Sequence, residues 1–278
     1  MEHPVFSAAV FSTDEILELP YTSAVTPHMF PYQLLERAKA NKKHIVLPEG
    51  DDDRILKAAH IILREGFADL TILGDPDTIR TRAQQLGLDL SAATLLDPTH
   101  YEGLDEFVET YYELRKHKGI SMDDARQKLQ DISYFATMMV HLGKADGMVS
   151  GAAHTTAHTI RPSFEIIKTK PGVSTVSSIF LMCLQDHVLA FGDCAVNIDP
   201  NPTQLADIAV SSAETASQFG VEPRVALLSY STGTSGSGAA VDKVRDAVTL
   251  AKENGMAYPI DGPIQFDAAV DASVAPAK

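Results

Sequence analysis

A dense run of small, hydroxylated and basic side chains, SGAAHTTAHTIRP at 150–162, follows a short apolar pair, Met148-Val149. If residues 145–151 form a strand, the run lies at the carboxyl end of that strand, where open α/β sheets bind ligands. Hydroxyl groups donate hydrogen bonds to phosphate oxygens, and a guanidinium group can hold a phosphate with two donors at once. The chemistry predicted here is the binding of an anion, with Arg161 as the main positive charge.

Further donors in this run are expected from both backbone and side chains. Gly151 lets the backbone turn and lets a ligand come close, and the N–H groups of a following helix attract negative charge. Pro162 disfavours the α-helical region for the residue before it, so we expect Arg161 to mark a helix boundary or a kink. A capped helix start with solvated threonines is the alternative interpretation. The hydroxyl groups available to an anion are those of Ser150, Thr155, Thr156 and Thr159.

Two other segments have a composition suited to anions. The segment YYELRKHKG at 111–119 gathers basic residues at a predicted helix end, where the helix dipole alone favours cations. It becomes part of a site only if it folds over the first run. The segment SYSTGTSGSG at 229–238 lies between a predicted strand and a predicted helix, so it suggests a second anion-binding nest, with a flexible connection as the alternative. It lacks the Lys-Ser/Thr ending of a Walker A loop, which argues against NTP hydrolysis.

Histidine and cysteine usage predicts neither a metal site nor a disulfide framework. His154 and His158 are four residues apart and could share a metal, but no acidic or cysteine ligand nearby in the sequence completes such a site. Cys183 lies in an apolar run and Cys194 follows a predicted strand end, without CxxC spacing. This usage fits a reducing cytoplasm.

Charge and hydropathy exclude several classes of protein. The 278 residues include 23 basic and 37 acidic side chains, a net charge of −14, which argues against general binding to nucleic acid or to an anionic membrane. The longest apolar run, IFLMCL at 179–184, is far too short to span a bilayer, and the first residues have no signal-peptide pattern. We therefore expect a cytoplasmic globular protein that acts on small molecules.

Strand and helix patterns alternate from residue 31 onward, which is typical of βαβ units with a parallel sheet covered by helices. The strands predicted at 173–184 and 187–193 are joined by only two residues, so we expect them to pair antiparallel. The tail from 259 begins in turn signals and then looks helical. Other strands are expected at 44–48, 68–74, 145–151 and 224–231, and helices at 32–41, 52–66, 75–87, 202–220, 240–255 and, in about three segments broken near Gly119 and Asp131, 102–142.

Six segments in this order resemble a known family: IVLPEGDDDRILKAA at 45–59, LRKHKG at 114–119, YFATMMVHLGKADGMVSGAAHTTAHTIRPSFEIIKTKPGVSTVSSIFLM at 134–182, FGDCAVN at 191–197, LLSYSTGTSGSG at 227–238 and DGPIQFDAAV at 261–270. They are similar to the phosphate acetyltransferase (phosphotransacetylase) family, which includes the phosphate butyryltransferases. The resemblance runs from about residue 30 to the end. It implies acetyl transfer between CoA and phosphate through a ternary complex, as in acetate metabolism.

The resemblance also implies ligands, partners and roles for particular residues. Acetyl-CoA, CoA, phosphate and acetyl phosphate would be substrates, no cofactor would be tightly bound, and the chain would form a homodimer. Arg161 would grip phosphate and the charge that develops in the transition state, and Arg115 would lie near the same cleft. The remaining matched residues would line the phosphate site or add donors from across the cleft: Ser150, Gly151, Thr155, Thr156, Ser231 and Thr232.

For the fold, the resemblance implies a three-layer α/β/α class with mostly parallel sheets and a cleft between two subdomains, 31–172 and 173–278. Residues 1–30 resemble the junction that follows a further domain in long, particularly actinobacterial, members. Family members continue beyond the FDAAV segment at 266–270 and end in a Ser-Arg-Gly segment that supplies a serine, an arginine and the aspartate proposed as thiol base. No such segment occurs here, so we expect a chain truncated at its C-terminus. Phosphate butyryltransferase and an inactive CoA- or acyl-phosphate-binding fragment are the alternative functions.

Overall fold

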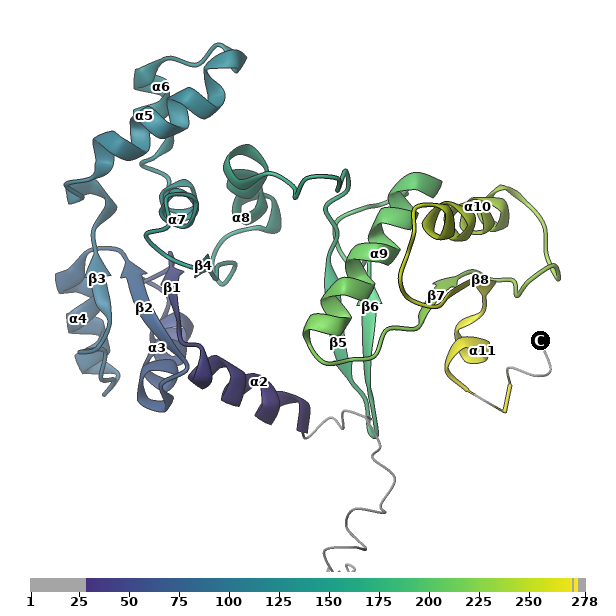
Figure 1. Cartoon of the computed structure of the whole chain (residues 1–278). Helices are drawn as coiled ribbons and strands as arrows, with labels where there is room; N and C mark the ends of the chain where they lie inside the picture. Colours follow the sequence, from purple (N-terminus) through teal and green to yellow (C-terminus); the bar gives the residue numbers. More distant parts are fainter. Residues whose placement is uncertain (1–28, 272, 275–278) are drawn as a thin grey trace, which may run out of the picture.

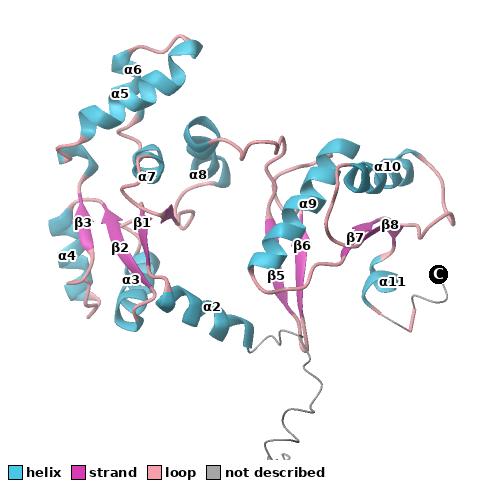
Figure 2. Cartoon of the chain, in the orientation of Figure 1, coloured by secondary structure: helices cyan, strands magenta, loops and turns pink. Residues whose placement is uncertain are grey.

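The first group of elements is built on a parallel sheet of four strands in the order β3-β2-β1-β4 (Figures 1 and 2). The computed structural model describes residues 29–271, 273 and 274, so residues 1–28 of the leader predicted at 1–30 lie outside the described residues, and Met29 and Phe30 belong to a helix. Ile45 pairs with Leu70 on one side and with Gly147 on the other. The elements are α2 (Met29–Ala40), β1 (Lys43–Leu47), α3 (Asp53–Glu65), β2 (Ala68–Leu73), α4 (Pro76–Gln85), β3 (Thr94–Leu96) and β4 (Gly147–Met148).

Local capping signals explain where the first helices begin and end. The carboxylate of Asp52 accepts a hydrogen bond from the backbone N–H of Arg54 at the start of α3, and Gly66 ends that helix in the left-handed conformation with φ 74°. Asp75 accepts from the backbone at the start of α4, with Pro76 in the first turn. The predictions for both helices are confirmed.

The sheet has an apolar cluster on each face, because successive strand residues point to opposite sides. Leu47 packs with α3 and α4, whereas the neighbouring Val46 packs with the helices that follow β3. The rings of Phe107 and Phe135 are centred 5.0 Å apart in that second cluster. These helices are α5 (Leu104–Arg115), α6 (Met122–Lys128) and α7 (Ile132–His141), with a short 3-10 turn, η2 (Lys116–Lys118), after α5. The predicted three-layer order and the three helical segments are confirmed here.

The second group of elements follows a helical stretch made of α8 (Thr156–Pro162) and a π-helical turn, η3 (Ser163–Ile167). The expected antiparallel hairpin is confirmed, with Leu181 opposite Ala190. Alanines and small apolar residues of α9 and α10 pack on the parallel pair β7 and β8. The elements are β5 (Ile179–Cys183), β6 (Val188–Gly192), α9 (Pro202–Gln218), β7 (Val225–Leu228), α10 (Ala239–Glu253), β8 (Ile260–Ile264) and α11 (Phe266–Val270).

The structure corrects three expectations about strands. The turn signals at the start of the tail were misleading, because Ile260–Ile264 forms β8, with Pro263 tolerated beside an irregularity in the pairing with β7. Residues 173–178 are not part of the hairpin strand, which begins only at Ile179. Strand β3 was not predicted, because its three residues are too few to produce a recognisable strand pattern in the sequence. The subdomain boundary near residue 172 stays a prediction.

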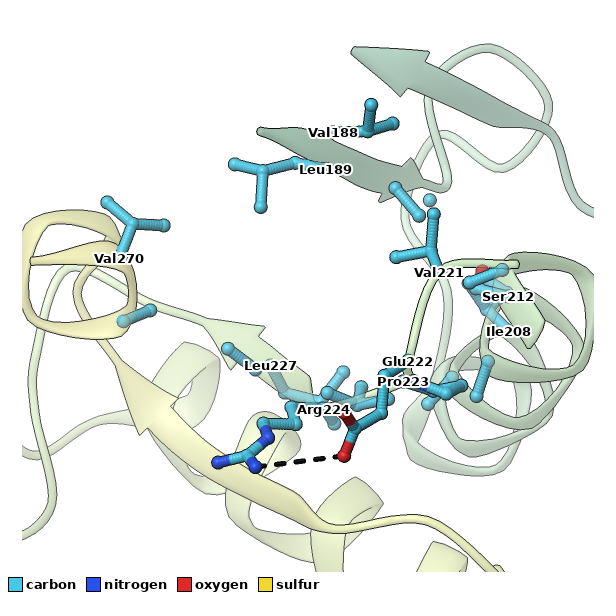
Figure 3. Close-up of a pocket in the computed structure, with 18 of the residues that line it drawn as sticks. Val188, Leu189, Ile208, Ser212, Val221, Glu222, Pro223, Arg224, Leu227 and Val270 are labelled. Atoms are coloured by element: carbon cyan, nitrogen blue, oxygen red, sulfur yellow. Dashed lines mark ion pairs between the residues drawn. The ribbon is translucent and has the colours of Figure 1, made fainter. Parts of the chain in front are cut away.

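A cavity of about 580 Å³ separates the hairpin from the pair β7 and β8. Val188 and Leu189 face it from β6, and Leu227 and Val270 face it from β7 and α11 (Figure 3). Its lining is largely apolar, and the two strand pairs are separate sheets in the described part of the chain. Within the same described residues, no helix has the length and apolar character needed to cross a bilayer.

Candidate anion site at the carboxyl end of the parallel sheet

Strands β1 and β4 bring two distant loops to one edge of the sheet. Because the strands are parallel neighbours, the residue that follows β1 and the run that follows β4 lie side by side. Glu49 lies two residues after the end of β1, and Gly151 lies three residues after the end of β4 and has a φ of 114°. The predicted anion loop therefore lies at a carboxyl strand end, as the sequence indicated.

The backbone donors of this loop already hold an anion, the buried carboxylate of Glu49. Its Oε2 accepts hydrogen bonds from the N–H groups of Gly151 at 3.0 Å and Ala152 at 2.9 Å. Its Oε1 accepts from the N–H groups of Ala153 at 2.8 Å and His154 at 3.0 Å. The N–H groups expected to attract an anion were those of the following helix, whereas these N–H groups of the loop before α8 are used to stabilise the loop.

Glu49 is a charged side chain with no solvent-exposed surface. Burial alone would raise its pKa, but the hydrogen bonds from Ala153, Ala152 and His154 outweigh burial and lower the pKa to about 2. Glu49 is therefore ionised at neutral pH. A carboxylate that accepts four backbone hydrogen bonds fixes the shape of the loop before any ligand arrives.

His154 in the loop and His158 in α8 each contact a carboxylate and so help to hold the loop in place. Their rings stack with centroids 4.6 Å apart. Nδ1 of His154 lies 2.8 Å from Glu49 Oε1, and Nε2 of His158 lies 2.7 Å from Asp131 Oδ2. Each imidazole thus has its own carboxylate. Within the described ranges, the structure has no group of three or more His, Cys, Asp or Glu side chains that could hold a metal ion.

Helix α8 presents Arg161 to solvent. Thr155 caps this helix by accepting a hydrogen bond from the N–H of His158, and Thr156 is its first residue. Arg161 was expected to mark a helix boundary or a kink, and it lies in the last turn of α8, one residue before that helix ends. The α-helix ends at Pro162 and continues directly as the π-turn η3, so the backbone changes type one residue later than expected.

An open cleft of about 420 Å³ lies between α8 and the loop after β6. Arg161 and Thr156 are its polar lining residues. Its apolar lining comes from both segments: Ala157, Ile160 and Phe164 on the helical side, and Ala195 and Val196 on the other. The cleft therefore combines one positive charge with an apolar wall.

The loop that supplies Ala195 and Val196 is held by a second internal carboxylate. Asp193 accepts hydrogen bonds from Ser178, from the N–H groups of Ala195 and Val196 at 3.2 Å, and from Asn197 through its backbone and side chain. Burial alone would raise the pKa of Asp193, but these hydrogen bonds keep it below its ordinary value. Both sides of the cleft are thus next to a loop held by a carboxylate, the buried one of Glu49 and the partly buried one of Asp193, and neither was identified from the sequence.

The other predicted residues divide into those near the cleft and those away from it. Arg115 reaches the helical stretch of Arg161, with Nη2 3.9 Å from Glu165 Oε1. The hydroxyl of Ser150 is buried without a hydrogen-bond partner among the described residues. Ser231 Oγ lies 3.1 Å from Ser235 Oγ, and the hydroxyl of Thr232 accepts from the backbone elsewhere in its own group of elements. The loop 229–238 lies at the far end of the molecule from α8 (Figure 1).

A family model described as Phosphate acetyl/butaryl transferase matches residues 29–278. The phosphate acetyltransferase of Corynebacterium glutamicum is 58% identical over 254 residues, which are 91% of this chain and 77% of that protein. The phosphate acetyltransferase of Nitratidesulfovibrio vulgaris is 56% identical over 257 residues, which are 92% of this chain but 36% of that protein. The chain thus spans little more than a third of that longer relative.

Solved structures with the same fold include two phosphotransacetylases. The EutD phosphotransacetylase from Staphylococcus aureus superimposes with a TM-score of 0.84 at 42% identity, over 92% of this chain and 78% of that one. The phosphotransacetylase from Streptococcus pyogenes superimposes with a TM-score of 0.86 at 41% identity, over 91% of this chain and 77% of that one. The predicted α/β fold class is confirmed.

Proposed function

The chain belongs to the phosphate acetyl/butaryl transferase family, and from that premise we propose that it carries the site of a phosphate acetyltransferase. The reaction is the reversible exchange of acetyl-CoA and phosphate for acetyl phosphate and CoA. The observation that carries the proposal is the cleft beside α8, in which Arg161 is the one charged residue among the described residues of an otherwise mostly apolar lining. The high identity to proteins named phosphate acetyltransferase supports acetyl as the acyl group.

The cleft suits the demands of acyl transfer. In the direction of acetyl-CoA synthesis, the thiolate sulfur attacks the acetyl carbonyl carbon, the carbon–sulfur bond forms, and phosphate leaves with the electron pair of the carbon–oxygen bond. Arg161 would hold the phosphate and stabilise the tetrahedral oxyanion, while Thr156 would donate one further hydrogen bond. The apolar wall would receive the acetyl methyl group. None of the described residues lining the cleft is a carboxylate or a histidine, so no thiol base is assigned.

CoA and its thioester act as substrates and not as tightly bound cofactors, and the chain works in the cytoplasm as a homodimer. The family resemblance supports these statements, and the net charge of −14 fits small-molecule substrates. A phosphate butyryltransferase and an inactive CoA-binding fragment are the alternatives that the experiment must separate.

The test is thioester formation by the purified chain from CoA and acetyl phosphate or butyryl phosphate, followed by ultraviolet absorbance. We expect turnover with preference for acetyl phosphate, and a loss of about 10²-fold in kcat/KM for Arg161→Ala, the range seen when a transition-state donor is removed. Arg126→Ala, which removes a surface ion pair with Asp105, is the matched control. CoA binding measured by calorimetry without turnover would establish the inactive fragment instead, and faster reaction of butyryl phosphate would establish the other transferase.

A further inference from the structure

We propose that Glu165 is a positioning residue of the phosphate site, which holds Arg115 against the helical stretch that carries Arg161. The proposal rests on the function proposed above, because it assigns both arginines to one phosphate site. Glu165 lies four residues after Arg161, in the π-turn η3 that continues α8. It was not among the residues that the sequence singled out.

The carboxylate of Glu165 is shared between two residues of α5. The hydroxyl of Tyr111 donates a hydrogen bond of 2.8 Å to Oε2, and Nη2 of Arg115 lies 3.9 Å from Oε1. Tyr111 and Arg115 are four residues apart, so they lie on the same face of α5. The side chains of Arg115 and Glu165 are only 23% and 21% exposed, so solvent screens this pair less than a surface pair.

The backbone gives Glu165 its direction. The N–H of Lys168 donates a hydrogen bond of 2.8 Å to the carbonyl of Ser163, five residues earlier, which is the bond of a π-turn. A π-turn rotates the residues within it relative to a continued α-helix, and such turns are frequent at functional sites. The same helical stretch thereby exposes Arg161 at the cleft and presents the carboxylate of Glu165 to α5.

The buried hydroxyl of Tyr134 lies within reach of both charges. It has no hydrogen-bond partner among the described residues, and its ring lies edge-on to Tyr111 with centroids 5.8 Å apart. Burial raises the pKa of Tyr134, the charge of Glu165 raises it further, and Arg161 acts in the opposite direction. The charges of Glu165 and Arg161 therefore both act on this one buried hydroxyl.

This arrangement explains how two guanidinium groups can serve one anion. Like charges repel, and a carboxylate beside Arg115 offsets its repulsion from Arg161. Without the charge of Glu165, the head of Arg115 would lose its partner and move into solvent. Phosphate would then be held by Arg161 alone, and its affinity would fall.

The first test measures inorganic phosphate binding by calorimetry in the whole chain. We expect Glu165→Gln, which keeps an acceptor for Tyr111, to raise the Kd for phosphate about tenfold, with the KM for acetyl phosphate rising in parallel and kcat changing little. Glu113→Gln is the matched control, because it removes the exposed ion pair between Glu113 of α5 and Lys116. This variant should bind phosphate as the wild type does. In an Arg115→Ala background, Glu165→Gln should have no further effect. Additive losses, or an unchanged Kd, would overturn the proposal.

A second test separates this proposal from the proposed function. Phenylglyoxal labels accessible arginines, and mass spectrometry gives the rate at each one. We expect Glu165→Gln, or Tyr111→Phe where the first variant folds poorly, to label faster at Arg115 and at an unchanged rate at Arg126, a surface reference. If the wild type binds no phosphate but Arg115 is released in this way, the proposed function fails and the positioning role stands. An unchanged rate at Arg115 would contradict the positioning role itself.

Discussion

Glu49 and His154, 105 positions apart in the sequence, are joined by two hydrogen bonds, one to the backbone N–H at 3.0 Å and one to Nδ1 at 2.8 Å. Because Glu49 also binds the N–H groups of the preceding residues, the loop after β4 is closed around an internal anion. The loop therefore offers a ligand its side chains and not its backbone. Its shape is set in advance, which is what a site for acyl transfer requires.

Replacing Glu49 should destabilise the protein markedly. In Glu49→Gln one oxygen becomes an NH₂ group that faces two backbone donors, so these donors lose their acceptor in a buried place. We expect a loss of about 3 kcal/mol in the free energy of unfolding at neutral pH, measured with urea. Glu36→Gln removes an exposed ion pair and should change it by less than about 0.5 kcal/mol. Equal losses in both variants would show that the buried carboxylate has no special role.

The same carboxylate predicts how stability depends on pH. Folding lowers the pKa of Glu49 from 4.5 to about 2, so its contribution is fully present above pH 4.5 and is lost as the pH falls to about 2. The lowering corresponds to at most about 3 kcal/mol. The lowered pKa of Asp193 acts in the same direction. Urea midpoints across this range should fall less steeply for Glu49→Gln than for the wild type, and parallel curves would contradict the assignment.

Asp193 should control the other side of the cleft. Asp193→Asn turns one carboxylate oxygen into an NH₂ group, so either the N–H groups of Ala195 and Val196, which share Oδ1, or that of Asn197, which uses Oδ2, lose their acceptor. We expect the amides of this segment to be released. Hydrogen exchange followed by mass spectrometry should speed up in this segment, with a loss of about 2 kcal/mol in stability. Asp186→Asn, an exposed carboxylate on the same hairpin, is the control. Unchanged exchange at 195–197 would mean that the loop is held by other contacts.

Local signals in the sequence were sufficient for most elements of the fold. Capping residues such as Asp75 with Pro76 act within one turn, and the short connector of the hairpin, predicted as two residues and observed as 184–187, allows only antiparallel pairing. They failed at β8, because Gly262-Pro263 reads as a turn although the pairing with β7 tolerates it. A strand of five residues containing such a pair gains its structure from its neighbour and not from its own propensity.

The candidate site was predicted less completely, for a different reason. Arg161 was found because hydroxyls and a cation are adjacent in the sequence, but Glu49 meets its loop more than 100 positions away. A signal did exist: Glu49 lies two residues after the end of β1, and parallel neighbours end at the same edge of the sheet. Glu165 had no comparable signal, since its direction depends on a π-turn that no sequence pattern indicated.

Ser231 should prove to be a structural residue and not a phosphate ligand, in contrast to Thr156. Ser231 is only 4% exposed and its hydroxyl pairs with Ser235, so Ser231→Ala should cost about 1 kcal/mol in the free energy of unfolding and leave the Kd for phosphate unchanged. Thr156 lines the cleft, so Thr156→Val should raise that Kd about fivefold while stability changes by less than about 0.5 kcal/mol. Calorimetry and urea unfolding on both variants give the four values. Weaker phosphate binding in Ser231→Ala would mean that the loop 229–238 reaches the cleft when ligand is bound.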